Sequence, residues 1–422
     1  MQLRSLLSSR WTMLAILSFA RAAMYMQSQG IPPLVPLMLV DLHINYTQVG
    51  LLIGMFFLPG AFIALPGGLA ARAMGDKPML LVCEVLLAGG ALALALSGSY
   101  LAALGGRLIS GVGAVMLNIQ VTKMTTDWFA NRGLATAMSV LTASWGLGMG
   151  LAFATLGGIG AAYGWRWAIA VTAVLPALAL LLTLLLYRNP PAVALAGGTA
   201  AGTATSGEAP APAVPTFAWR ELINRWEVGA ATLAGLIRMC FMVGLAVWQS
   251  FTPDYLVGRG MAPGAAGALV SVSTWLLLVS VPLGGLLTDR LRAGAPIIVL
   301  GSLISGGVAA LVPAWGGLAV VFVLLGLVSG MPIGAIMALP AEFLRPSSRN
   351  VGFAVFFTWS YVGMGVLPTV AGALRDATGA PAAPLLFSAV VIALSAVAYV
   401  GYRLLRRLAL ARAGSGVFGA AS

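Results

Sequence analysis

Charged side chains are scarce in this chain. Of its 422 residues, only 8% are Asp, Glu, Lys or Arg, whereas a soluble domain carries roughly 25%. So few charges cannot cover the surface of a globule that faces water. The composition therefore excludes an ordinary soluble protein.

Histidine and cysteine are scarcer still, with one His and two Cys. Cys83 and Cys240 lie far apart in apolar stretches, so neither the spacing of a metal site nor a disulfide framework is present. His43 has no second histidine with which to form a zinc site or to activate a nucleophile, and the chain has no phosphate-binding loop or nucleophile elbow. We expect no enzymatic activity, no cofactor and no bound metal.

Long apolar stretches, in contrast, recur along the whole chain, whose mean hydropathy is +0.98. Stretches of about 18 residues or more can cross a membrane, and inside a bilayer they must be helical to satisfy their backbone hydrogen bonds. We predict an all-α membrane protein with transmembrane helices at residues 12–38, 45–70, 78–98, 102–123, 133–157, 165–187, 228–252, 264–288, 295–314, 317–340, 350–372 and 383–403.

One long polar segment divides these helices into two sets of six. Residues 189–227 contain a run of Ala, Pro, Gly and Thr that cannot bury a core, which is typical of a flexible linker. The sequence predicts an N-terminal six-helix bundle at residues 1–188, this linker, and a C-terminal six-helix bundle at residues 228–422.

The basic residues are unevenly distributed between the two ends of the predicted helices. The net charge is +12; seventeen Lys and Arg fall on the side of the termini, and only Arg166, Arg259 and Arg375 fall on the other. This asymmetry predicts a multi-pass protein of the cell inner (plasma) membrane with both termini in the cytoplasm. The bases lie in short loops and not on a soluble module, so we expect no nucleic-acid partner.

The two halves match each other in sequence. Adding 217 to the residue number relates Arg21 to Arg238, Pro36 to Pro253, Gly50 to Gly267, and the Gly67–Gly68 pair to Gly284–Gly285. Such a repeat predicts two pseudo-symmetric bundles with a substrate site between them, near the middle of the membrane.

Several motifs resemble those of the major facilitator superfamily. The family's loop motif between its second and third helices is partly present twice, as Gly285-Leu-Leu-Thr-Asp289-Arg290 and as the stretch from Gly68 to Lys77, where Arg72 replaces the usual acid. Arg107-x-x-x-Gly111-x-Gly113, Gly146-x-Gly148-x-Gly150 and Gly164-Trp165-Arg166-Trp167 are also similar to family patterns.

This resemblance implies transport by alternating access, with Asp289 and Arg290 in gating. Within the superfamily two groups compete. Paired arginines on the first and seventh helices resemble the organophosphate and organic-anion carriers. The stretch from Ala246 to Pro253 is similar to the cyanate and nitroimidazole transporters.

Arg21 and Arg238 are the strongest candidates for substrate binding. Each lies about ten residues into its predicted helix, roughly 15 Å deep, where a guanidinium costs at least about 2.5–3.5 kcal/mol. That is too deep to reach the interface, and acids at a matching depth are nearly absent. An anion bound between the two arginines would neutralise both. The alternative is a role in helix packing or gating.

Further candidates follow from their places on the same helices. Arg107 serves in coupling, or else holds backbone carbonyls as a structural arginine. Glu84 serves as a proton-coupling carboxylate, or else pairs with Lys77 or Arg72. Polar and aromatic side chains expected to line the cavity are Tyr25, Gln29, Asn118, Gln120, Trp248, Gln249, Trp359 and Tyr361; for the aromatic residues, contact with lipid is the alternative.

The sequence thus predicts a monomeric secondary transporter that carries a small anion, with H⁺ as a candidate coupling ion. An exporter of an uncharged or cationic amphiphile, with structural arginines, is the second hypothesis. A membrane sensor that does not transport is the third.

Overall fold

The computed structural model describes residues 9–63, 74–129, 133–189, 224–291, 294–315, 318–344 and 348–414. All secondary structure in these ranges is helical, as predicted. Within the described residues, ten helices are long and apolar enough to cross a membrane. They are α6 (Asp76–Ala95), α7 (Tyr100–Phe129), α8 (Leu134–Tyr163), α9 (Trp165–Leu186), α12 (Arg225–Gly258), α13 (Pro263–Leu291), α14 (Gly294–Trp315), α15 (Ala319–Ala338), α16 (Arg349–Thr378) and α17 (Ala383–Gly414).

The first two predicted spans are not continuous helices, and in this respect the prediction was wrong. The first is divided into α2 (Arg10–Ser28), a 3₁₀ turn η1 (Pro32–Leu34) and α3 (Val35–Asp41). The prolines at positions 32, 33 and 36 cannot donate backbone hydrogen bonds to a continuing helix. The second begins as α4 (Tyr46–Gly54), which is followed by turns as far as Pro59.

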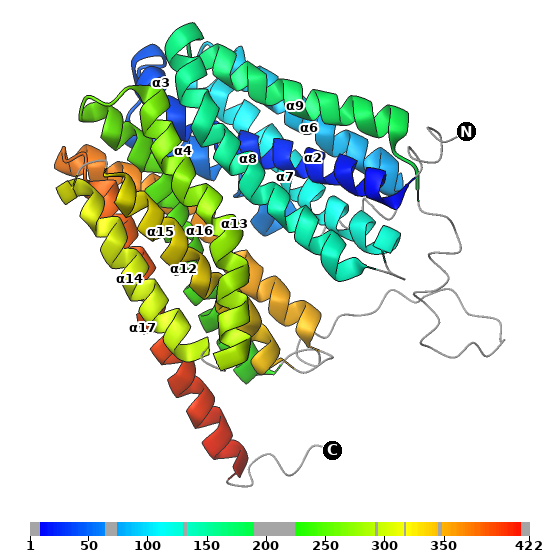
Figure 1. The fold of residues 1–422 in the computed structure, drawn as a ribbon, viewed down its shortest axis with the longest axis vertical. Coiled ribbons are helices and arrows are strands. Elements are labelled where there is room, and N and C mark those ends of the chain that lie inside the picture. The colour runs from blue at the N-terminus through cyan, green and yellow to red at the C-terminus, as the bar shows by residue number, and fades with distance from the viewer. Residues whose placement is uncertain are drawn as a thin grey trace, which may run out of the picture.

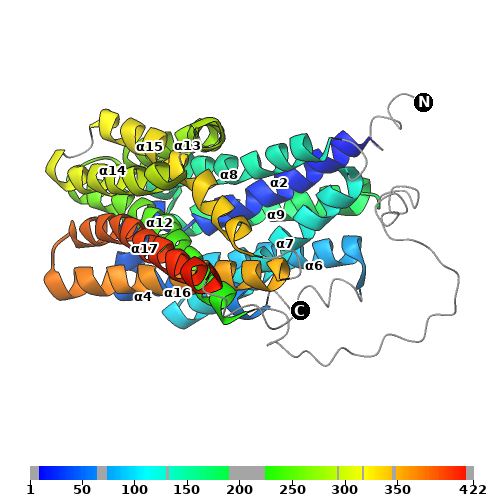
Figure 2. The same cartoon turned by 90° about the horizontal axis from the view of Figure 1, so that it is seen from below.

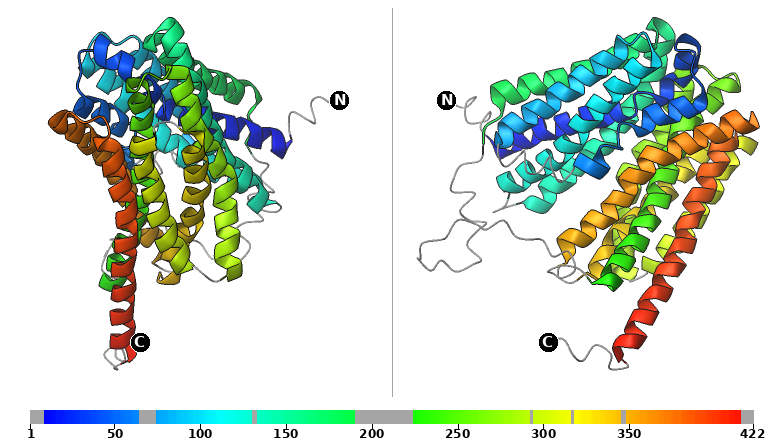
Figure 3. Two further views of the ribbon diagram at one scale, coloured as in Figure 1. Left: turned by 60° about the vertical axis from the view of Figure 1, so that its left-hand side comes forward. Right: turned by 180° about the vertical axis from the view of Figure 1, so that it is seen from behind.

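The helices form two groups that meet at one end. In Figure 1, α2 and α6 to α9 run together in one direction, while α12 to α17 run together in another. Figures 2 and 3 show the two groups close together near α4 and the start of α13, and farther apart at the ends where α2 begins and α17 ends. We call the end where they meet the closed end.

Two pairs of helices join the groups at the closed end. In the first, which we call the α4–α16 seam, a Cβ atom added to Gly50 would lie 2.2 Å from the carbonyl oxygen of Pro368, and one added to Gly372 would lie 2.0 Å from that of Tyr46. In the second, the α8–α13 seam, a Cβ at Gly267 would lie 2.2 Å from the carbonyl oxygen of Phe153. Gly50 and Gly267 are equivalent in the sequence repeat, and both permit close approach to the opposite group.

The three spaced glycines of α8 pack against two different neighbours. A Cβ at Gly148 would lie 2.1 Å from the carbonyl oxygen of Ala22 in α2, whereas Cβ atoms at Gly146 and Gly150 would meet Leu278 and Trp275 of α13. Residues two apart point to different sides of a helix. This motif therefore lets α8 lie close to its own group and to the other group at once.

Candidate functional site

Arg21 lies in α2 and faces α8. Its Nη1 atom donates a hydrogen bond of 3.0 Å to the carbonyl oxygen of Leu141, and its guanidinium lies 5.7 Å from the ring centre of Tyr25. Tyr25 in turn makes an edge-to-face contact with Trp145 of α8. The Nε atom of Arg21 is buried and has no hydrogen-bond partner among the described residues. The Nε–H of Arg21 is thus available to donate a hydrogen bond in largely apolar surroundings.

Arg238 occupies the equivalent place in α12 and faces α15 and α16. Its Nη1 donates a hydrogen bond to the hydroxyl of Ser360, and its Nε contacts the sulfur of Met337 at 3.4 Å. The guanidinium also lies 4.8 Å from the ring centre of Phe357. Such cation–π contacts stabilise a desolvated cation without neutralising it. In the described part of the chain, neither Arg21 nor Arg238 forms an ion pair with an acid.

Tyr361 of α16 interacts electrostatically with both of these arginines. It interacts with the side chain of Asn118 from α7 and lies within electrostatic range of Tyr25, Arg21 and Arg238. Its ring also fills the space beside Gly60, in the other group of helices. Five of the predicted residues, contributed by four helices from both groups, therefore come together. We call Arg21, Tyr25, Asn118, Arg238 and Tyr361 the central cluster.

Two features of the central cluster suit it to a polar ligand. The carbonyl oxygen of the Asn118 side chain, like the Nε of Arg21, is buried without a hydrogen-bond partner among the described residues. Unsatisfied buried polar atoms are costly, at about 1–3 kcal/mol each. Two cations, two phenols and an amide offer several hydrogen-bond donors and could hold an anion.

Trp359 lies beside the central cluster, whereas four other predicted residues lie away from it. Trp359 packs against Gly235 of α12, one turn before Arg238. Trp248 is fully buried and packs on Phe322. The other three are also buried: Gln249 donates to Thr274 and Gln120 to Asp76, while Gln29 lies at the end of α2.

The contacts of Arg107 are those of a structural arginine that holds backbone carbonyls, which was the second of its two predicted roles. It is 1% exposed and donates to three backbone carbonyls, those of Leu52, Gln27 and Ser28, at 2.7–3.1 Å. The carbonyls of Gln27 and Ser28 belong to the last turn of α2, where a helix leaves such groups unsatisfied. Arg107 therefore joins the end of α2 to α4.

Glu84 is fully buried inside the first group of helices. Its Oε1 accepts a hydrogen bond of 2.9 Å from Thr183 of α9, and its Oε2 has no partner among the described residues. The expected partner Lys77 donates instead to the carbonyls of Leu184 and Tyr187, so that expectation was wrong. Arg72, the other expected partner, lies outside the described residues.

The predicted gating residues Asp289 and Arg290 lie at the end of α13. Arg290 is exposed in the last turn of α13. The side chain of Asp289 lies outside the part of the chain that the structure describes.

Ser360, Phe357 and Met337 were not predicted, although they surround Arg238. One signal was available for the first two. They belong to the run Phe356-Phe357-Thr358-Trp359-Ser360-Tyr361, in which polar and aromatic residues alternate in a span that is otherwise apolar. Met337 carries no comparable signal, because methionine is common in transmembrane helices.

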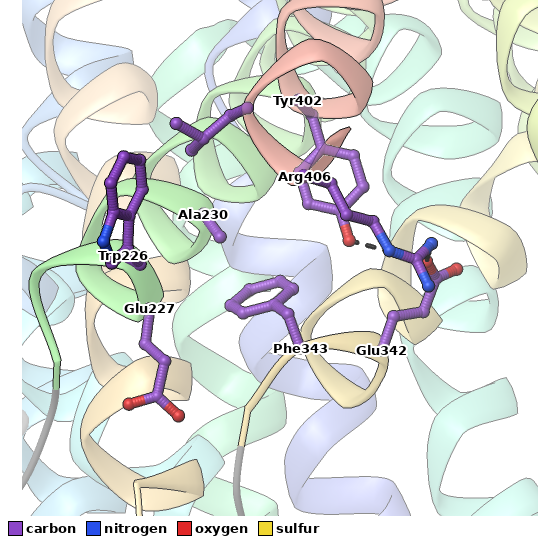
Figure 4. A pocket seen from close by; sticks show the side chains of 8 residues that line it. Trp226, Glu227, Ala230, Glu342, Phe343, Tyr402 and Arg406 are labelled. Carbon is purple, nitrogen blue, oxygen red and sulfur yellow. Dashed lines mark hydrogen bonds and ion pairs between the residues drawn. The ribbon is translucent and has the colours of Figure 1, made fainter. Parts of the chain in front are cut away.

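A separate pocket of about 320 Å³ lies at the other end of the second group of helices, away from the central cluster. It is formed by the start of α12, the 3₁₀ turn η2 (Leu339–Glu342) and α17. Figure 4 shows Phe343 between Trp226 and the Tyr402–Arg406 side of the pocket. Arg406 pairs with Glu342 at 2.8 Å, so the pocket contains a neutralised ion pair and none of the predicted site residues.

Comparisons with known proteins agree with this architecture. Residues 17–368 match the family model described as Major Facilitator Superfamily. Among curated proteins, the chain is 22% identical over 267 residues to a hexuronate transporter of Bacillus subtilis, and this match covers 63% of the chain and 61% of that relative. It is 24% identical to a probable sulfoacetate transporter of Cupriavidus necator, with 93% of each covered.

Solved structures resemble the chain in fold alone. A bacterial homolog of the human lysosomal transporter Spinster, in an inward-facing and unoccupied conformation, has a TM-score of 0.73 at 18% identity and covers 95% of this chain and 96% of its own. The nucleoside transporter NupG has a TM-score of 0.69 at 14% identity, with 94% and 99% covered.

Proposed function

Because the chain belongs to the major facilitator superfamily, we propose that it is a secondary transporter of a small organic anion, with Arg21 and Arg238 as the residues that bind the negative charge. Residues 1–188 and 228–422 are the two bundles that move relative to each other, joined by the linker at 189–227. The molecule acts as a monomer, and its candidate coupling ion is H⁺.

One observation carries this proposal. Two arginines in equivalent positions of the repeat, in opposite groups of helices, both interact electrostatically with the same tyrosine, Tyr361, and neither has an acidic partner among the described residues. A ligand that lies between both groups can be exposed to each side of the membrane in turn as the groups rock. Two guanidiniums facing one space favour a ligand with at least one anionic group.

The names of the relatives suggest which anions to test first. Hexuronates carry a carboxylate on a polyol, and sulfoacetate carries a carboxylate and a sulfonate, so both are small organic anions. We expect sulfoacetate, a hexuronate or another small anion to raise the thermal unfolding midpoint of the purified protein. A ligand at 100 times its Kd stabilises the folded state by about 2.7 kcal/mol. An uncharged nucleoside and a lipophilic cation are the matched controls.

The second candidate function is export of an uncharged or cationic amphiphile. It is favoured by the contacts of Arg238 with Ser360, Met337 and Phe357, which could satisfy this arginine without a ligand. If only the lipophilic cation or the nucleoside stabilises the protein, this second function replaces the first.

The proposed topology places both termini, and the end where the two groups of helices diverge, in the cytoplasm, with the closed end outside. We expect reporter domains fused at Gly202 and after Arg412 to be active only as cytoplasmic reporters, because seventeen bases lie on that side and three on the other. At each position, one fusion to alkaline phosphatase, which is active only outside the cytoplasm, and one to a fluorescent protein, which fluoresces only inside it, show on which side the position lies. Alkaline phosphatase activity at either position would contradict the topology.

A further inference from the structure

The closed end of the α4–α16 seam contains a group of polar contacts that cross between the two groups of helices. The carboxylate of Asp376, near the end of α16, accepts hydrogen bonds from the backbone N–H groups of Tyr46 and Thr47 at 3.1 and 2.8 Å and from the Thr47 hydroxyl at 2.6 Å. These N–H groups belong to the first turn of α4, which has no intrahelical acceptors for them. A carboxylate from one bundle thus caps a helix of the other, where the helix dipole also favours a negative charge.

The preceding residue, Arg375, holds the side chain of Tyr46. Its guanidinium lies 3.6 Å from the ring centre of Tyr46, and it forms an ion pair with Asp254 of α12. The side chains of this pair are 10% and 5% exposed, whereas every other ion pair of the described residues has both side chains at least 20% exposed. Arg375 is therefore fixed by its own bundle and placed firmly against the other.

The α8–α13 seam at the same end shares the close backbone packing of the α4–α16 seam but not its polar contacts. There, a Cβ at Gly157 would lie 2.6 Å from the carbonyl oxygen of Pro263, and one at Gly264 would lie 3.4 Å from the Cα of Gly158. The contacts are between backbones and small residues. In the described residues no ion pair or side-chain hydrogen bond crosses this seam.

This difference predicts how the closed end opens. Water can replace hydrogen bonds and ion pairs one at a time as helices separate, so polar contacts can break and re-form reversibly. Close backbone packing without polar contacts, as at the α8–α13 seam, has no such replacement and favours small rotations about a fixed line. We propose that Arg375 and Asp376 form a latch on Tyr46 and Thr47, and that the closed end opens at the α4–α16 seam while the α8–α13 seam serves as the hinge.

This inference rests on the proposed alternating access but not on the identity of the substrate, so its test uses the ligand-free protein. In a background with Cys83→Ala and Cys240→Ala, spin labels at Val40 and Ala380 report on the latched seam, and labels at Tyr163 and Ala262 report on the hinge seam. All four positions are exposed at the closed end. Double electron–electron resonance then gives the distance distribution of each pair.

We expect Asp376→Ala to raise the longer-distance population of the Val40/Ala380 pair at least threefold and to change the Tyr163/Ala262 pair much less. Asp376 is exposed, so this substitution should not prevent folding. The double variant Arg375→Gln with Asp254→Asn removes the second half of the latch without leaving a buried charge unpaired, and it should act in the same direction.

The matched control is Asp41→Asn. Asp41 accepts hydrogen bonds from Trp165 and Arg166 at the same end of the molecule, but within one bundle. These two bonds, that from Trp165 first, hold the pKa of Asp41 below its usual value, so the substitution removes a charge that is present at neutral pH. It should leave both distance distributions unchanged. An unchanged Val40/Ala380 distribution in both latch variants overturns the latch, and equal lengthening of the two pairs overturns the hinge.

Discussion

Replacing either Arg21 or Arg238 with alanine is expected to weaken binding of the transported anion by at least about tenfold. A hydrogen bond to a charged group contributes about 1.5–3 kcal/mol, and 1.4 kcal/mol is a factor of ten in affinity. Lysine at either position should weaken binding less, because it keeps the charge but loses the planar donor pair. Isothermal titration of the purified variants with the anion found in the thermal screen measures the effect.

The double alanine variant provides the internal control. If both arginines bind one ligand, its loss should be smaller than the sum of the two single losses, because the two substitutions act on the same interaction. Arg407→Ala, which removes an exposed arginine of α17, should leave the affinity unchanged. Native affinity in both single alanine variants would make the arginines structural and would favour the exporter of a non-anionic amphiphile.

Replacing Gly50 with valine is expected to change the ratio of open to closed forms at the α4–α16 seam by at least about tenfold, or 1.4 kcal/mol. The new Cβ would lie 2.2 Å from the Pro368 carbonyl oxygen, and backbone atoms cannot move aside as a flexible side chain can. The clash exists only while the two groups are together. The substitution should therefore disfavour closure without unfolding either bundle.

The distance between labels at Val40 and Ala380 measures this change. Gly89→Val is the matched control, because Gly89 has no atom within 4 Å of an added Cβ. It adds the same side chain to a helix surface that touches nothing, and it should leave the distances as they are. If Gly50→Val also keeps the short distance, close backbone contact at this seam is not needed for closure.

The arginine pair was predictable because it depends on depth and repetition alone. Both residues lie about ten residues into their predicted helices, and the 217-residue offset carries one to the other. The same helices explain why Trp248 and Gln249 lie away from the central cluster. Trp248 is ten residues from Arg238 and so points about 80° away, and Gln249 lies about 16 Å further along the axis. A helical projection that includes depth along the axis would have placed both residues away from Arg238.

Contacts between distant parts of the chain could not be predicted in this way. Asp254 and Arg375 are 121 positions apart, and Thr47 and Asp376 are 329 apart. In the sequence, each of these residues is only a polar or charged residue near a helix end, and nothing in its local sequence indicates its partner. The partner of Glu84 was missed for the same reason, because nothing near Glu84 in the sequence points to Thr183.

The hydrogen bonds of Arg107 have a consequence for the mechanics of the two halves. In the second half, α12 runs as one helix of 34 residues from Arg225 to Gly258 and carries Arg238 on an unbroken rod. In the first half, the helix that carries Arg21 stops at Ser28, and its end is fastened to α4 by Arg107 instead of by its own continuation. Arg238 is held by the backbone hydrogen bonds of one continuous helix, whereas the helix that carries Arg21 is held at its end by the side chain of Arg107. The two halves therefore place their arginines at equivalent positions but hold the helices that carry them by different contacts.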